Sequence, residues 1–231
     1  MLRRMMLASN SSGSSVDPFW SSVLFLLRMD GSATDVKGRP FVIAGTPSFV
    51  AGRFGQALAP GSGASGVTDN TPEHADYALG SGDFTIECWL KQAAGSIGGA
   101  VISLFDTVGT NGWQVYVSGG QPQFYQYDGG GSGGSYPLIA PGVDIRDGGW
   151  HHIAVSRNSG TMRMFVDGVQ VASAANSTNY GYSLLYMSIG YQRQGNSRYP
   201  FNGAIDEVRI TKGVGRYPST FTVPSAPFPG S

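Results

Sequence analysis

The chain is short of charge and of cysteine. Only 13% of its 231 residues are charged, and 15 basic side chains balance 15 acidic ones, so the formal net charge is zero. Without a basic surplus there is no electrostatic surface for a phosphate backbone, which excludes a dedicated nucleic-acid-binding protein. The single cysteine, Cys88, cannot form an internal disulfide, and the sequence has no Cys/His cluster with zinc spacing. Its lack of disulfides favours synthesis in a reducing compartment.

Long apolar runs are absent as well. The longest, residues 23–27, is far below the roughly 20 residues that cross a bilayer, so we expect no membrane insertion. The amino-terminus begins with Arg3 and Arg4, as a signal peptide does, but the apolar stretch at residues 5–8 is too short and continues into Ser, Asn and Gly. These patterns predict a protein with no signal peptide that is made in the cytoplasm.

What the chain has instead is glycine, proline and aromatic residues. Its 35 glycines and 13 prolines interrupt the sequence too often for long helices, and no helical period is present. Apolar and polar residues alternate along residues 83–91, which puts Phe84, Ile86, Cys88 and Leu90 on one face of a strand. We therefore expect Cys88 to be a buried core residue.

Similar short segments recur about every ten residues, which indicates an all-β, antiparallel two-sheet jelly-roll sandwich. Further strands are expected around residues 19–31, 39–46, 53–61, 100–109, 112–128, 150–173, 183–191 and 200–213. Asp167-Gly168 is the strongest hairpin signal. Residues 63–83 are expected to be mostly loop.

The organisation predicted from this pattern has three parts. Residues 1–16 are rich in Ser and Gly and should form a flexible arm, and residues 17–214 should form the sandwich. Residues 215–231 carry several prolines and should form an extended tail. Its aromatic rings should pack along the sandwich or reach a neighbouring subunit.

The strand predicted around residues 200–213 does not alternate strictly. Phe201 and Ile205 have one parity, whereas Val208 and Ile210 have the other. Either a β-bulge near Asp206 or burial of the strand on both faces explains this pattern.

The ordered segments FGQAL, DFTIECWL, WHHIAVSR, MRMFVDGVQV, YMSIG and FNGAIDEVRI together resemble the laminin-G-like jelly roll of the concanavalin A-like lectin/glucanase superfamily. The resemblance covers roughly residues 20–214 and implies this fold together with a tendency to bind ligands. The opening FWSSVLFLLRMDG and the closing RITKGVGRYPSTFTVPSAPFP are similar to the flanks of such domains in bacteriophage virion proteins.

Catalysis is not expected. The glucanase-type relatives use carboxylates on one face of a strand, and no Glu-x-Asp-x-Glu pattern occurs in the chain. Asp206 and Glu207 are adjacent and point to opposite faces, and so do His151 and His152. We expect these histidines to be half-buried at a sheet edge.

A calcium ion pins the first strand to the last in several jelly rolls of the superfamily. That resemblance implies a Ca²⁺ site at Asp30 and Asp206, because Ca²⁺ prefers hard oxygen ligands. The alternative is that Asp206 caps a bulge and Asp30 begins a turn.

Ligand binding is expected from tyrosines in the Gly-, Ser- and Asn-rich connections, where flat rings can stack on sugars or contact proteins. These residues are Tyr125, Tyr127, Tyr136, Tyr180, Tyr182, Tyr191 and Tyr199. The alternative is that the rings cover sheet faces with their hydroxyl groups in water.

Together these observations predict a non-catalytic structural and adhesion protein of a bacteriophage virion, either a capsid decoration protein or a component of the tail or a fibre. Its partners would be other virion proteins, copies of itself or a glycan of the host surface, and its location the virion. The alternative is a free-standing bacterial carbohydrate-binding protein.

Overall fold

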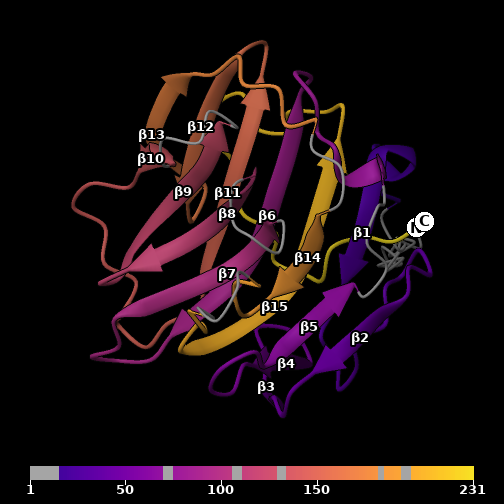
Figure 1. Cartoon of the computed structure of the whole chain (residues 1–231), viewed down its shortest axis with the longest axis vertical. Coiled ribbons are helices and arrows are strands. Elements are labelled where there is room, and N and C mark those ends of the chain that lie inside the picture. Colours follow the sequence, from indigo (N-terminus) through magenta and orange to yellow (C-terminus); the bar gives the residue numbers. More distant parts are fainter. Residues whose placement is uncertain (1–15, 70–74, 106–110, 129–133, 182–184, 194–198) are drawn as a thin grey trace, which may run out of the picture.

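The computed structural model describes residues 16–69, 75–105, 111–128, 134–181, 185–193 and 199–231. The predicted amino-terminal arm lies almost entirely outside them. Two sheets form a sandwich, and every paired strand is antiparallel (Figure 1). No helix among these residues is long and apolar enough to span a bilayer. The predicted all-β two-sheet class is confirmed.

Sheet A has eight strands in the order β13-β12-β11-β6-β15-β4-β3, with β1 also paired to β15. In chain order these are β1 (Val23–Leu27), β3 (Ser48–Ala51), β4 (Gln56–Ala59), β6 (Phe84–Gln92), β11 (His151–Asn158), β12 (Thr161–Val166), β13 (Val169–Ala175) and β15 (Gly203–Lys212).

Sheet B has seven strands in the order β10-β9-β8-β7-β14-β5-β2. They are β2 (Phe41–Ala44), β5 (Gly66–Asp69), β7 (Gly98–Phe105), β8 (Asn111–Ser118), β9 (Gln121–Asp128), β10 (Ser135–Ile139) and β14 (Tyr186–Ile189). Two short 3₁₀ turns, Trp20–Ser22 and Ala75–Tyr77, complete the regular elements of the described chain.

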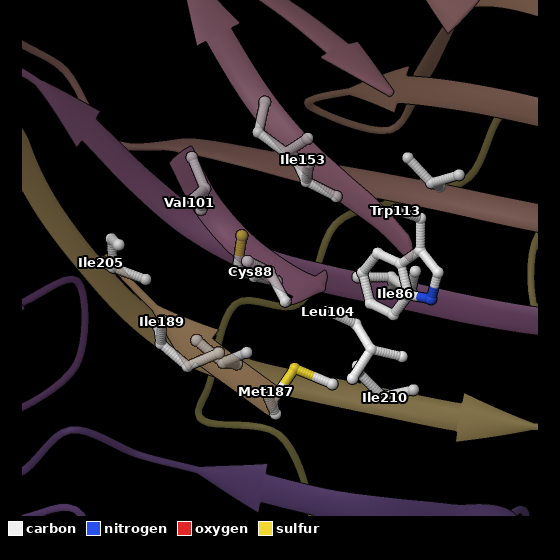
Figure 2. Close-up of a cluster of buried hydrophobic side chains, with 14 of the residues drawn as sticks. Ile86, Cys88, Val101, Leu104, Trp113, Ile153, Met187, Ile189, Ile205 and Ile210 are labelled. Atoms are coloured by element: carbon white, nitrogen blue, oxygen red, sulfur yellow. The ribbon is translucent and has the colours of Figure 1, made fainter. Parts of the chain in front are cut away.

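The main core lies between the two sheets. Figure 2 shows Ile86 and Cys88 of β6 beside Val101 and Leu104 of β7. Phe84, Ile86, Cys88 and Leu90 all belong to this core, as their alternation predicts. Cys88 is 1% exposed, and burial raises the pKa of its thiol above the usual range. The predicted burial of Cys88 is confirmed.

Both explanations offered for the irregular last strand hold. The pairing of β15 with β6 shifts register between Asp206 and Arg209, and Glu207 has a positive φ of 49°. A bulge there turns the side chains that follow it to the opposite parity. Every residue of β15 except its two ends is also buried.

The outer face of sheet A is covered by residues 215–231, which form no helix or strand. The ring of Phe221 packs 5.3 Å from that of Phe165 and stacks on Tyr217 at 3.6 Å. Phe228 is fully buried and forms a second, smaller core with Val23, Leu26 and Trp89. Of the two arrangements predicted for the tail, packing against its own sandwich is the one observed.

A buried charge network lies beneath this tail. Arg209 of β15 donates to Glu87 of the neighbouring strand at 3.0 Å and to Asp17 at 2.9 Å. Arg216 also donates to Asp17, and the Tyr217 hydroxyl donates to Glu87 at 2.7 Å. Burial raises the pKa of Glu87, but the positive charges of Arg209 and Arg216 and the neighbouring His152 together outweigh burial and lower that pKa below its usual range.

The prediction for the smaller strands is less accurate. Residues 63–83 were expected to be mostly loop, yet β5 lies within them and pairs with both β2 and β14. Strands β3 and β10 are also additional to the prediction. These strands have four or five residues each, too few for an alternating pattern to stand out.

The charge network gives a stability prediction. Arg209→Met should lower the free energy of unfolding by about 3–5 kcal/mol, because it removes the nearest cation of the buried Glu87 and leaves Asp17 with Arg216 alone. Urea denaturation followed by tryptophan fluorescence measures the change. Lys91→Met is the matched control, since Lys91 lies exposed on β6, and it should change stability by less than about 0.5 kcal/mol. Equal effects of the two variants would contradict a structural role for the network.

Candidate functional site

A polar groove of about 380 Å³ lies on the outer face of sheet B, over β8, β9 and β10. Figure 1 shows these three strands side by side at one end of the sheet. The described side chains that line it are neutral: Gln114, Tyr116, Ser118, Gln123, Tyr125, Tyr127, Tyr136, Gln192 and Tyr199.

Strand alternation builds the floor of this groove. Along β8 the side chains of Trp113, Val115 and Val117 enter the core, so Gln114, Tyr116 and Ser118 face outward. On β9, Phe124 enters the core and Gln123, Tyr125 and Tyr127 face outward. The antiparallel register places Gln114 opposite Tyr125 and Tyr116 opposite Gln123. Each of these rings therefore lies directly opposite an amide on the neighbouring strand, and the two rings are diagonal to each other.

The tyrosine rings support one another at the β9–β10 end. Tyr125 lies 5.2 Å from Tyr127 in an edge-to-face arrangement and 4.7 Å from Tyr136 of β10. Phe105 packs 6.3 Å from Tyr125 and 6.0 Å from Tyr127. Such contacts fix ring orientation before any ligand arrives. Tyr136 stays 48% exposed, so its ring remains available for stacking.

The hydroxyl groups of Tyr125 and Tyr116 remain protonated at neutral pH. Burial and the neighbouring hydroxyl of Tyr127 raise the pKa of Tyr125, and burial raises that of Tyr116. A protonated phenol both donates and accepts hydrogen bonds. Together with glutamine amides, these groups match the hydroxyl groups of a polar, uncharged ligand.

The structure gathers four of the seven predicted tyrosines in the groove: Tyr125, Tyr127, Tyr136 and Tyr199. Tyr180 and Tyr191 were predicted to be exposed ligand-binding residues, but they are buried, with exposed fractions of 0% and 3%. Tyr180 packs between Phe84 and Phe124, and its hydroxyl donates to Gln126. Tyr182 lies outside the described residues.

Several groove residues were missed from the sequence. Tyr116 and Gln114 lie on a regular strand, whereas the prediction looked for ligand-binding residues in connections. A signal was present: residues 112–118 alternate large apolar side chains with Gln, Tyr and Ser. A strand with one apolar face and one face of Tyr and Gln indicates an exposed sheet face suited to binding.

The two aspartates proposed for calcium both bind the turn between β3 and β4. Asp206 accepts a hydrogen bond from the Phe54 N–H at 2.9 Å, and Asp30 accepts one from the Gln56 N–H at 2.7 Å. Asp206 is fully buried, and its other carboxylate oxygen has no protein partner in the structure. Both aspartates therefore hold the β3–β4 turn, which differs from the alternative of a bulge cap at Asp206 and a turn beginning at Asp30.

These residues do not make a calcium site by themselves. Within the described part of the chain, no group of three or more His, Cys, Asp or Glu is placed to hold a metal ion. Ca²⁺ takes six to eight oxygen ligands, so two carboxylates already bonded to backbone N–H groups are a poor match. Calcium binding stays a prediction, tested below.

The histidines diverge as expected, and His151 is half-buried as predicted, but the prediction for His152 is wrong. His152 is fully buried in a central strand, among the rings of Trp89, Phe221 and Phe228. His151 points the other way, to Asp147 and Asp167 at 2.9 and 2.7 Å. These two carboxylates raise the pKa of His151 to about 9. Neither histidine lines the groove.

The sequence of the chain shows to which family the sandwich belongs. Residues 62–214 match a laminin-G family described as the concanavalin A-like lectin/glucanases superfamily. The chain belongs to this superfamily. The match covers the strands from β5 to β15, which include every strand that carries the groove. No curated protein shows significant similarity to the chain.

Solved structures with the same fold include several carbohydrate-binding domains. Domain 4 of AbnA, a GH43 extracellular arabinanase from Geobacillus stearothermophilus in complex with arabinotriose, has a TM-score of 0.64 and 19% identity over 83% of this chain and 93% of its own. The sialidase CBM40 of Ruminococcus gnavus bound to α2,3-sialyllactose has a TM-score of 0.50 and 16% identity, covering 67% of this chain and 87% of its own.

Larger proteins share the fold over part of their length. The botulinum neurotoxin type C structure, whose cell entry depends on two ganglioside molecules, has a TM-score of 0.62 and 13% identity. The match covers 89% of this chain and 49% of that one. At these identities the likeness shows the fold alone, a lectin-like jelly roll found in binding domains.

The buried Asp206 carboxyl generates a pH prediction. Burial raises its pKa to about 7. The hydrogen bond from the Phe54 N–H acts to lower this pKa, whereas the negative charge of Glu207 raises it further. Between about pH 4 and 7 the folded protein holds a proton that the unfolded chain has released, so stability contributed by this group falls as pH rises through that window.

Asp206→Asn should remove this loss, because the amide stays neutral and its oxygen still accepts from Phe54. Relative to the native protein, the variant should gain about 2–4 kcal/mol in unfolding free energy between pH 5 and pH 8. Thermal melts at both pH values measure the difference, and the same difference at both pH values would contradict the prediction.

Calcium gives a separate test. If Asp206 is a calcium ligand, millimolar Ca²⁺ at pH 7.5 should raise the melting temperature of the native protein and leave that of Asp206→Asn unchanged.

Proposed function

We propose that this protein binds carbohydrate through the groove on the outer face of sheet B. The observation that supports it is the neutral lining of tyrosine rings and glutamine amides on adjacent strands. Aromatic faces stack on the C–H groups of sugars, while amides and phenols bond to their hydroxyl groups. The arabinotriose complex of a similar domain adds support at the level of the fold.

The other broad face of the sandwich is a poor alternative for this role. Residues 215–231 already cover the outer face of sheet A, with Phe228 fully buried against it. A ligand there would have to displace Phe221 and Tyr217 and expose the buried charges of Glu87 and Arg209. The groove of sheet B needs no such rearrangement.

We propose further that binding is not accompanied by hydrolysis. Glycoside hydrolysis uses two carboxyl groups on either side of the scissile bond. Of the described residues that line the groove, none is Asp, Glu or His. The role that fits is recognition rather than turnover.

Tyr136→Ala tests the site directly. The ring is half-exposed, so its loss should leave the melting temperature within a few degrees while weakening glycan binding about tenfold or more. Binding is measured on an array of neutral polysaccharides and sialylated oligosaccharides, followed by calorimetry on the retained glycans. The control is Tyr186→Ala, which removes a ring from β14 outside the groove. Equal binding by both variants, or no glycan bound by the native protein, would overturn the site.

The finer proposal is that this adhesion module belongs to a bacteriophage particle. Its support is the likeness of the opening and closing segments to the flanks of such domains in virion proteins. If so, the protein should co-sediment at fixed stoichiometry with gradient-purified particles from its source cells. Recovery only from the particle-free fraction would instead favour a free-standing carbohydrate-binding protein.

A further inference from the structure

A second hollow, of about 540 Å³, adjoins the polar groove. Its lining is formed by Pro60, Gly61, Ser62, Ile97, Gly98, Gly99, Tyr116, Tyr199, Pro200, Phe201 and Asn202. Ile97 is 85% exposed, more than any other large apolar side chain of the described chain. Together with Pro60 and Pro200, Ile97 gives the hollow an apolar lining that suits an apolar ligand group. We call this space the apolar hollow.

Two tyrosines belong to both spaces. Tyr116 and Tyr199 line the polar groove and the apolar hollow alike. A ligand that lies against these two rings therefore meets amides and phenols on one side and proline and isoleucine on the other. The combined site fits a ligand with a polar part and an apolar part next to each other.

Tyr199 is held in this position at a conformational cost. Its φ is +33°, in the left-handed region that a bulky residue rarely adopts. The proline that follows restricts it further. The strain is maintained by a hydrogen bond of 2.9 Å from the Ala100 N–H to the Tyr199 carbonyl oxygen. Strained residues of this kind concentrate at functional sites.

Two glycines allow the backbone segments around the apolar hollow to pack closely against each other. A Cβ on Gly99 would lie 2.1 Å from the carbonyl oxygen of Pro200, and one on Gly98 would lie 1.9 Å from that of Val117. Both glycines also have positive φ. Backbone thus packs on backbone, and the rings of Tyr116 and Tyr199 supply the walls.

The absence of charge and the kind of polar groups among the described lining residues limit which ligands fit. None of the described residues lining either space is charged, so a carboxylate or sulfate on the ligand would find no cation among them. Ser62 and Asn202, in the lining of the apolar hollow, bring a hydroxyl and an amide that can donate to a carbonyl oxygen. An ester carbonyl with an apolar end matches that combination.

We propose that the ligand is an uncharged glycan that carries an O-acyl group, with sugar rings in the polar groove and the acyl group in the apolar hollow beside Ile97. Tyr199 stands between the two spaces and contacts both the sugar and the acyl group. This inference rests on the proposed function, because it names the glycan class that the groove takes.

The test uses an array of neutral, sialylated and uronic-acid-containing glycans, on which each acylated glycan is printed before and after alkaline removal of its ester-linked acyl groups. The native protein should bind the acylated form of its glycan about tenfold more tightly than the de-acylated form. Ile97→Ser should abolish that ratio and leave binding of the de-acylated form unchanged. Val169→Ser, at an exposed position on β13, is the control and should keep the ratio.

Tyr199→Gly gives an independent readout. Glycine adopts a positive φ without strain, so the melting temperature should stay equal or rise while both forms of the glycan bind more weakly. Tyr199→Phe keeps the ring and should retain the preference for the acylated form. A merely structural tyrosine would instead lose stability on replacement by glycine.

The outcomes separate the two proposals. Equal binding of acylated and de-acylated polysaccharides by the native protein would overturn the acyl inference and leave glycan binding intact. Binding only to sialylated or uronic-acid-containing glycans would overturn the uncharged class. If no glycan of any form were retained, the proposed function itself would fall.

Discussion

The contact between Glu87 and Arg209 determines how the two faces of this sandwich are used. The two residues are cross-strand neighbours on β6 and β15, the central pair of sheet A, and both are almost fully buried. Buried charges need partners and a cover that excludes water. Asp17, Arg216 and Tyr217 satisfy the charges and hydrogen bonds, and the tail with Phe228 provides the cover. One face of the protein is thereby committed to holding its own chain.

Sheet B has the same strand geometry but leaves part of its outer face uncovered. Its inward side chains are as apolar as those of sheet A, but on β8 and β9 the outward ones are Gln, Tyr and Ser. No segment comparable to the tail covers these residues in the described structure, and they line a hollow. The two faces therefore differ because of their outward side chains. Those of sheet A include charges that must be buried, whereas those of sheet B include neutral tyrosine rings that remain accessible.

The predictability of each element follows its length and regularity. The long alternating strand at residues 84–92 revealed its core face and the burial of Cys88. Strand β5 has four residues, all buried, and its position depends on pairing with distant β14, which no local pattern records. Tyr180 shows the same limit: composition predicted an exposed loop ring, but two distant rings, Phe84 and Phe124, enclose it. The groove required the register of β8 with β9, which is a property of the folded sheet.

The glycine pair Gly98-Gly99 has a consequence for how this protein can change over time. Where the floor of a site is packed backbone, mutation has no side chain there to replace, and any substitution at either glycine would collide with a carbonyl oxygen. Variation that retains the fold is directed to the rim, at Ile97 and Tyr199, which are both exposed. Related proteins should therefore share the floor of this region and differ at its edge.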